Sequence, residues 1–137
     1  MCLYSNTNIP SIAQEDIYCY KEFSKGCIPS EKYIITPYQR IMIPVSLLPF
    51  MLEAVGNKWV RAEYSDRKLY MIGEGFIHAY AKNQWIVDYI TMYKNDSAYK
   101  HSYSLVLCKI PKGSKYYKSF DRIEICAERM EIIRKII

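Results

Sequence analysis

The short run from Tyr103 to Ile110, YSLVLCKI, is the feature that most restricts how this chain can fold. It is apolar along most of its length, and it ends at the turn sequence Pro-Lys-Gly of residues 111–113. This length and composition are typical of a strand buried inside a sheet, and the run is short for a helix. The rest of the chain must therefore supply strands that pair with it.

Further strand-like runs occur along the chain. Residues 17–23 and 58–64 are rich in β-branched and aromatic side chains. Residues 122–137 are rich in isoleucine and carry no helix cap, which favours strands, although a helix over residues 128–137 fits the spacing as well. One segment instead has apolar residues at helical spacing, namely Trp85, Ile86, Tyr89, Ile90 and Tyr93. We predict an α+β fold, a mostly antiparallel twisted sheet or sheets with one main helix around residues 83–94.

Other segments are harder to assign. Residues 1–10 are polar and turn-like, and residues 11–16, SIAQED, have a capping-like order that favours a short turn of helix. Between residues 38 and 57, Pro44 argues against a central strand, and a helix beginning at Ser46 would be limited by Pro49. The sequence leaves helix and strand open there.

The length and charge of the chain limit the kinds of protein that it can be. The 137 residues suffice for a single domain, 1–137, that needs no metal or disulfide bridge. Tyrosine is unusually frequent, at 14 residues against 4 phenylalanines, which suits half-buried sheets and recognition surfaces. The net charge of +5 favours an anionic partner but does not single out nucleic acid.

The cysteines form an odd set without a Cys-x-x-Cys pair, so we expect free thiols in a reduced, cytoplasmic protein. They are Cys2, Cys19, Cys27, Cys108 and Cys126. His78 and His101 have no cysteine or histidine at ligand spacing, so we expect no metal and no cofactor. No apolar run is long enough to span a membrane, and the oligomeric state stays open.

Residues 71–81, MIGEGFIHAYA, are the second informative stretch. Its glycines permit a bulge or the close approach of a ligand, and the following alternation places Phe76, His78 and Tyr80 on one face. His78 has two interpretations, an acid–base or anion-binding group, or an imidazole bonded to a backbone carbonyl. Together with the strand of residues 17–23, the predicted ligand-binding side chains are Tyr20, Lys21, Glu74, Phe76, His78 and Tyr80.

Lys21 shares its strand face with apolar residues, which is costly for an ammonium unless a carboxylate meets it. We expect this carboxylate to be that of Glu74 or Glu128. If it is Glu128, then Lys21, His78 and Glu128 form one site. In the alternative, the lysine reaches water at the strand end and the three groups never meet.

Residues 109–122 form a basic, aromatic segment that we predict to be hairpin-like, with only Asp121 offsetting its charge. Basic side chains interleaved with aromatic ones suit contacts with phosphates and bases. Solvated lysines of an edge strand give the same pattern. The turn at Gly113 also offers backbone N–H groups to an anion. The predicted contact residues are Lys109, Lys112, Lys115, Tyr116, Tyr117, Lys118 and Arg122.

Three stretches stand in a recognisable order: residues 2–23, CLYSNTNIPSIAQEDIYCYKEF, residues 74–80, EGFIHAY, and residues 106–117, VLCKIPKGSKYY. This order resembles a family of small uncharacterised proteins of Bacteroidales genomes, their mobile elements and their phages. The resemblance spans nearly the whole chain and implies ancestry without assigning chemistry. The family block reads Gly-Phe-His, whereas here Ile77 stands before His78, which changes the sheet face of the histidine.

The chain also has a remote likeness to the ADP-ribosyltransferase fold, in which an arginine, a serine-containing strand and a late glutamate hold NAD. The matching positions are Lys21, the strand of residues 76–80, and Glu128 or Glu131. Lysine in place of arginine forfeits the bidentate grip on phosphate, and the central strand has no serine. The likeness implies a nucleotide-sized groove and, if the chain is an enzyme, Lys21, His78 and Glu128 as catalytic residues.

From these features we expect a non-enzymatic binding or interaction protein. Its target would be a small anionic, nucleotide-like ligand or a host protein, in the phage or mobile-element setting that the resemblance implies. Two alternatives stay open, an ADP-ribosyltransferase-like enzyme that uses NAD and a nucleic-acid-binding module built on residues 109–122.

Overall fold

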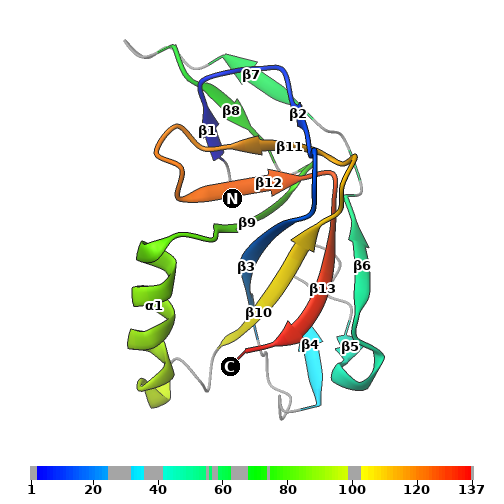
Figure 1. Ribbon diagram of the computed structural model, residues 1–137, viewed down its shortest axis with the longest axis vertical. Helices are drawn as coiled ribbons and strands as arrows, with labels where there is room; N and C mark the ends of the chain where they lie inside the picture. Colours follow the sequence, from blue (N-terminus) through cyan, green and yellow to red (C-terminus); the bar gives the residue numbers. More distant parts are fainter. Residues whose placement is uncertain are drawn as a thin grey trace.

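The computed structural model of the protein describes residues 3–24, 32–35, 42–54, 56, 59–62, 68–73, 75–98 and 103–136. Within these ranges it is mostly antiparallel sheet with one α-helix, in keeping with the α+β prediction (Figure 1). The early strands are β1 (Leu3–Ser5), β2 (Ser11–Ile12), β3 (Ile17–Ser24), β4 (Tyr33–Ile35), β5 (Met42–Pro44), β6 (Phe50–Glu53) and β7 (Val60–Ala62). The later elements are β8 (Tyr70–Ile72), β9 (Ile77–Ala81), α1 (Gln84–Lys94), β10 (Tyr103–Ile110), β11 (Lys115–Lys118), β12 (Glu124–Ala127) and β13 (Arg129–Lys135).

The main sheet has eight strands in the order β2-β11-β12-β9-β3-β10-β13-β6. Strand β10 lies inside it, paired with β3 along its whole length and with β13 on its other edge, which confirms the predicted buried strand. In Figure 1, β11 and β12 run across the molecule while β3, β10 and β13 run along it. The chain turns between the two directions at Glu128, whose backbone N–H donates to Lys115 and whose carbonyl accepts from Ala54.

Two clusters of buried side chains form the core. The larger lies on the face of the main sheet that carries Cys19, Ile77 and Ile132, and the smaller contains Phe76 and Cys126. Ile77, Ala79 and Ala81 of β9 all face the larger cluster, as the period-two pattern predicts, and Phe76, just before the strand, packs in the smaller one. The free thiols of Cys19, Cys108 and Cys126 are buried among these side chains, whereas Cys2 and Cys27 lie outside the described residues.

Helix α1 confirms the predicted helix of residues 83–94 almost to the residue. The Asn83 side chain accepts from the N–H of Ile86 at 3.0 Å, which satisfies one of the free donors at the helix start. Ile86 is buried completely, and most of the other helical side chains are exposed or half-buried. Figure 1 shows the helix standing at one side of the sheet. No helix in the described ranges is long and apolar enough to cross a membrane.

Several local predictions are wrong, and pairing with distant strands explains each of them. The predicted turn-like start contains β1, which pairs with β8, and the predicted helical turn at residues 11–16 contains β2, which pairs with β11. For residues 38–57, where the sequence left helix and strand open, the described part forms β5, a short 3-10 turn (Val45–Leu47) and β6, which pairs with β13.

The predicted hairpin of residues 109–122 is also wrong. Both edges of β10 are occupied by β3 and β13, so β11 cannot fold back onto it. Strand β11 instead pairs with β12 and β2, and the hairpin of this region has its turn at residues 119–123.

Candidate functional site

The ammonium of Lys21 is buried on the apolar face of β3, as its place in the alternation predicts. Strands β3 and β9 pair through Cys19 with Ala81 and Tyr20 with Tyr80, and Lys21 Nζ then donates to the carbonyl of His78 at 2.5 Å. The amine therefore satisfies a backbone acceptor close to the end of this ladder. Burial lowers the pKa of Lys21 to about 8, although the nearby Cys108, Cys19 and Glu22 act in the opposite direction.

The imidazole of His78 is buried, and its Nε2 lies 3.0 Å from the carbonyl oxygen of Gly73. A carbonyl can only accept, so Nε2 carries the proton and donates. Of the two interpretations of His78, the structure therefore shows the second, an imidazole bonded to a backbone carbonyl. The bond ties β9 to the end of β8 and orients the ring.

Lys21 and His78 do line one cavity, together with Glu22, Ala79, Tyr80 and Glu124. Its volume is only about 40 Å³, far below the roughly 300 Å³ at which ligand pockets begin. Glu128 is not among its lining residues, since its carboxylate accepts from the N–H of Lys115 at 3.3 Å. Two carboxylates line the cavity with Lys21 and His78. One is that of the neighbouring Glu22, which accepts from the Tyr89 hydroxyl, and the other is that of Glu124, on β12 opposite Tyr80.

Burial, and then the neighbouring charge of Asp121, raise the pKa of Glu124. Sequence reasoning missed this residue because only the pairing of β9 with β12, far apart in the chain, brings it to the cavity. Of the other predicted ligand-binding residues that the structure describes, Tyr80 lines this cavity, whereas Tyr20 and Phe76 are not among its lining residues. Tyr20 is half-buried opposite Tyr80, Tyr80 contacts the rings of Trp85 and Tyr89, and Phe76 lies in the smaller core cluster. Glu74 lies outside the described residues.

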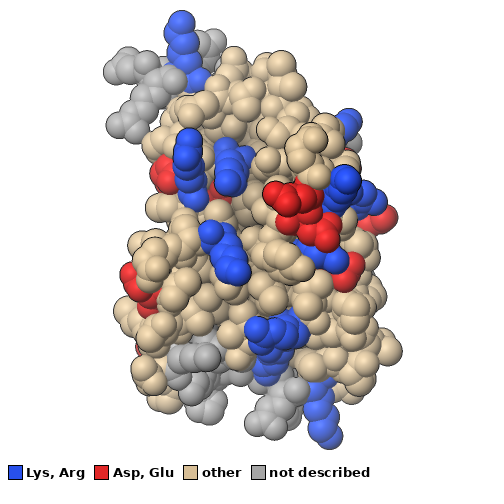
Figure 2. Space-filling model, in the orientation of Figure 1, with Lys and Arg blue, Asp and Glu red and all other residues tan. Residues whose placement is uncertain are grey.

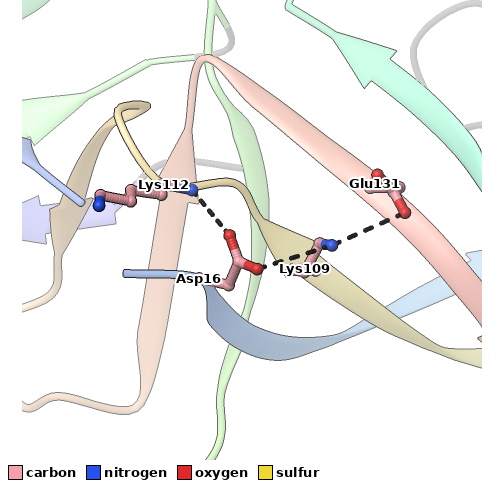
Figure 3. Close-up of polar contacts among 4 residues, drawn as sticks. All are labelled: Asp16, Lys109, Lys112 and Glu131. Carbon is pink, nitrogen blue, oxygen red and sulfur yellow. Dashed lines mark hydrogen bonds and ion pairs between the residues drawn. The ribbon is translucent and has the colours of Figure 1, made fainter. Parts of the chain in front are cut away.

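Lys109 was predicted to contact an anion, but its ammonium is already paired with carboxylates of the protein. Its Nζ lies 3.7 Å from a carboxylate oxygen of Asp16 and 4.0 Å from one of Glu131 (Figure 3). Asp16 also accepts from the backbone N–H of Lys112 at 2.9 Å, while the Lys112 side chain points away from it. Asp16 therefore joins the start of β3 to the end of β10.

The turn after β10 offers no open set of N–H groups to an anion. Besides the N–H of Lys112, that of Gly113 donates to Ala13 at 2.8 Å and that of Ser114 donates to Pro111 at 3.1 Å. Gly113 has φ +86°, a left-handed conformation that favours glycine, so its role is to make the turn. The predicted anion site at Gly113 is wrong because these N–H groups already donate to Asp16, Ala13 and Pro111.

A larger groove lies at the other end of β11, between the β11–β12 turn and the link from β1 to β2. Its volume is about 420 Å³. Small polar side chains form one wall, namely Ser5, Asn6, Thr7 and Ser11. The other wall consists of Tyr116, Tyr117, Lys118, Ser119, Phe120 and Arg122. We call this the N-terminal groove, and it contains four of the seven predicted anion-contact residues.

Lys118 and Arg122 are the charged side chains among the described lining residues of this groove. Both are exposed, and neither forms an ion pair with another residue that the structure describes. Lys109, Lys112 and Lys115 are not among the lining residues. In Figure 2, Lys and Arg side chains spread over the visible face, several of them in the region where Figure 1 shows β11 and β12. The predicted contact residues are therefore divided between the groove, which contains Lys118 and Arg122, and positions outside it, which include the exposed Lys112 and Lys115.

Asp121, the one acid of this turn, is directed into the turn by hydrogen bonds. Its carboxylate accepts from the Ser119 hydroxyl at 2.5 Å and from the N–H of Ile123 at 3.1 Å. These two bonds, the Ser119 bond first, lower the pKa of Asp121. Ser119 in turn accepts from the N–H of Glu124 at 3.0 Å. The turn is closed by its own side chains, and Asp121 is absent from the lining of the groove.

The aromatic side chains that line the groove differ in their exposure to solvent. Tyr117 is buried, its hydroxyl donates to the carbonyl of Asn8 at 3.0 Å, and its ring meets Phe76 edge to face. Burial raises the pKa of Tyr117. Tyr116 is half-buried against the main core, so the exposed ring is that of Phe120, with 39% of its surface accessible. Phe120 was missed, although its place midway between Lys118 and Arg122 was a readable signal.

Comparison of this chain with protein-family models, with curated proteins and with solved structures finds no match. The resemblance to the Bacteroidales family and the likeness to ADP-ribosyltransferases therefore stay predictions.

Proposed function

We propose that this protein binds a small anionic ligand in the N-terminal groove. The observation that carries the proposal is a groove of about 420 Å³ whose described charged lining residues, Lys118 and Arg122, are both cations. This volume lies within the range of roughly 300–1,000 Å³ that small-molecule sites occupy. The smaller cavity at Lys21 does not support binding of a ligand of this size.

The charge pattern favours an anion such as a phosphate or carboxylate. Arg122 can donate two parallel hydrogen bonds to such a group, while Lys118 adds a compact positive charge. The overall charge of +5 further favours the approach of an anion. The carboxylate of Asp121 accepts from Ser119 and Ile123 and is not among the residues that line the groove.

A nucleic-acid-binding module is the second candidate, and the groove supports it less well. A strand that followed residues 109–122 would need a continuous row of free cations. Lys109 is already paired with Asp16 and Glu131, and the N–H groups at Gly113 are used within the protein. A compact ligand at Lys118 and Arg122 needs neither of these groups.

Two further predictions rest on other grounds. An ADP-ribosyltransferase-like activity would draw on Lys21, His78 and Glu128, whereas the carboxylates that line a cavity with the first two are those of Glu22 and Glu124. A role in a phage or mobile element, with a host protein as target, rests on the family resemblance alone.

The test is a thermal-shift and calorimetric screen against inorganic phosphate, pyrophosphate, citrate, NAD, ADP-ribose and cyclic nucleotides at low salt. We expect at least one anion to bind, and we expect the double variant Lys118→Ala/Arg122→Ala to weaken that binding by about tenfold or more. The matched control is Lys32→Ala/Lys112→Ala, which removes the same charge from exposed positions outside the groove. An anion that binds the double variant as tightly as the original protein would overturn the proposal, as would the absence of any binding anion.

A further inference from the structure

We propose that the anion is the phosphate of a nucleoside phosphate, whose base stacks on the ring of Phe120. This inference rests on the proposed function, because it names the class of ligand that the N-terminal groove takes. The ligand must then carry, besides a negative charge, a planar ring at a fixed place beside the phosphate.

The order of residues after β11 creates this combination. Lys118, Phe120 and Arg122 alternate with Ser119 and Asp121, and all three line the groove. Ser119 lines the groove as well and is buried, and its hydroxyl donates to Asp121, which is not among the lining residues. The end of β11 and the turn that follows it therefore contribute an accessible aromatic ring and two exposed cations to one wall.

The backbone holds this wall in position before any ligand arrives. The N–H of Phe120 donates to the carbonyl of Tyr4 at 2.8 Å, which ties the turn to β1. The N–H of Arg122 donates to Ser119 at 3.0 Å, and its carbonyl accepts from the Asn83 side chain at 3.2 Å. A preformed wall reduces the entropy lost on binding and so favours a small ligand.

The opposite wall supplies groups that suit a sugar. The Ser5 hydroxyl is buried and accepts from the N–H of Thr7, and the Thr7 hydroxyl accepts from the N–H of Ile9. Asn6 and Ser11 line the groove with exposed side chains that can donate to and accept from hydroxyl groups. A nucleoside phosphate matches this arrangement, with its phosphate at the cations, its base on Phe120 and its sugar toward Asn6 and Ser11.

The same chemistry is present in a free nucleotide and at the end of a single-stranded nucleic acid. Base stacking on an aromatic side chain is worth about 1–3 kcal/mol for each base, with little dependence on its identity. A single exposed ring favours one base, so we expect a free mononucleotide to fill the groove. A strand that binds through several nucleotides would require further rings.

The experiment compares ligands that differ by one part, using calorimetry with AMP, ribose 5-phosphate, pyrophosphate and adenosine. We expect Phe120→Leu to weaken AMP about fivefold to a hundredfold and to leave ribose 5-phosphate unchanged, because only the base meets the ring. Phe50→Leu, on the distant edge strand β6 and similarly exposed at 36%, is the matched control and should leave both affinities unchanged. Thermal unfolding of each variant confirms that the fold is retained.

The possible results distinguish failure of base stacking from failure of the proposed anion binding. If ribose 5-phosphate and AMP bind equally well, or if Phe120→Leu weakens both alike, the anion site stands and the stacking of a base is refuted. If none of the four compounds and no other anion binds, the proposed function fails as well. An adenylate tetranucleotide that binds with the affinity of AMP supports the single-base site, and one that binds at least tenfold more tightly refutes it.

Discussion

The buried ammonium of Lys21 should make the stability of the protein depend on pH in a window where few other groups act. Burial lowers its pKa from 10.5 to about 8 in the folded state. Between these two values the unfolded chain binds more protons than the folded one, so the free energy of unfolding rises with pH. The charged amine thus costs stability below pH 8, and the cost is removed progressively up to about pH 10.5.

The magnitude follows from the size of the change. Since one pKa unit corresponds to about 1.4 kcal/mol, the full cost is roughly 3 kcal/mol, of which about 1 kcal/mol is recovered between pH 7 and pH 9. Above pH 9 the buried thiols oppose the trend, because burial raises the pKa of Cys108 and of Cys126 to about 12 and also raises that of Cys19. Such thiols stabilise the fold below their ordinary pKa of 9.0 and lose that contribution as the pH rises above it.

The measurement is urea unfolding followed by tryptophan fluorescence at half-unit steps from pH 7 to pH 9, for the original protein and for Lys21→Met. Methionine replaces the unbranched chain up to Cε but loses the amine and its bond to the carbonyl of His78, so the absolute stability reports two effects at once. The pH slope reports the amine alone. From pH 7 to pH 9 we expect the free energy of unfolding of the original protein to rise by about 1 kcal/mol relative to that of Lys21→Met. We expect the curve of the exposed control Lys112→Met to run parallel to that of the original protein. Parallel curves for the original protein and Lys21→Met would refute the reasoning.

Three further predictions concern the remaining contacts. His78→Phe should lower the free energy of unfolding by about 1–3 kcal/mol, because it leaves the carbonyl of Gly73 without the imidazole donor, while anion binding in the groove stays unchanged in calorimetry. Asp16→Ala should cost about 1 kcal/mol or more in urea unfolding, because it removes the partner of Lys109 and of a turn N–H, whereas Glu15→Ala on the adjacent exposed residue should cost little. The three buried cysteines should resist alkylation in the native protein and react fully in urea, and mass spectrometry that finds any of them modified under native conditions would contradict their burial; they are Cys19, Cys108 and Cys126.

Local patterns in the sequence were sufficient for the elements that depend on local physics. The apolar run Tyr103–Ile110 forms the buried strand that it predicts, and the spacing of apolar residues after Asn83 predicts helix α1. Period-two alternation alone was enough to predict that Lys21 lies among apolar side chains and that Ile77 and Phe76 face different ways. Each of these features follows from the geometry of a single strand or helix.

The tertiary structure decided which distant segments meet, and with that the site. The pairing of β9 with β12 brings Glu124 rather than Glu128 to Lys21 and His78. The pairing of β2 with β11 encloses the N-terminal groove, and Asp16 withdraws Lys109 from the basic surface. Such pairings depend on the register of strands that lie up to a hundred or so residues apart, and a shift by one residue would turn each side chain to the opposite face. No local spacing carries that information, because the register is set by how all the strands bury their apolar faces together.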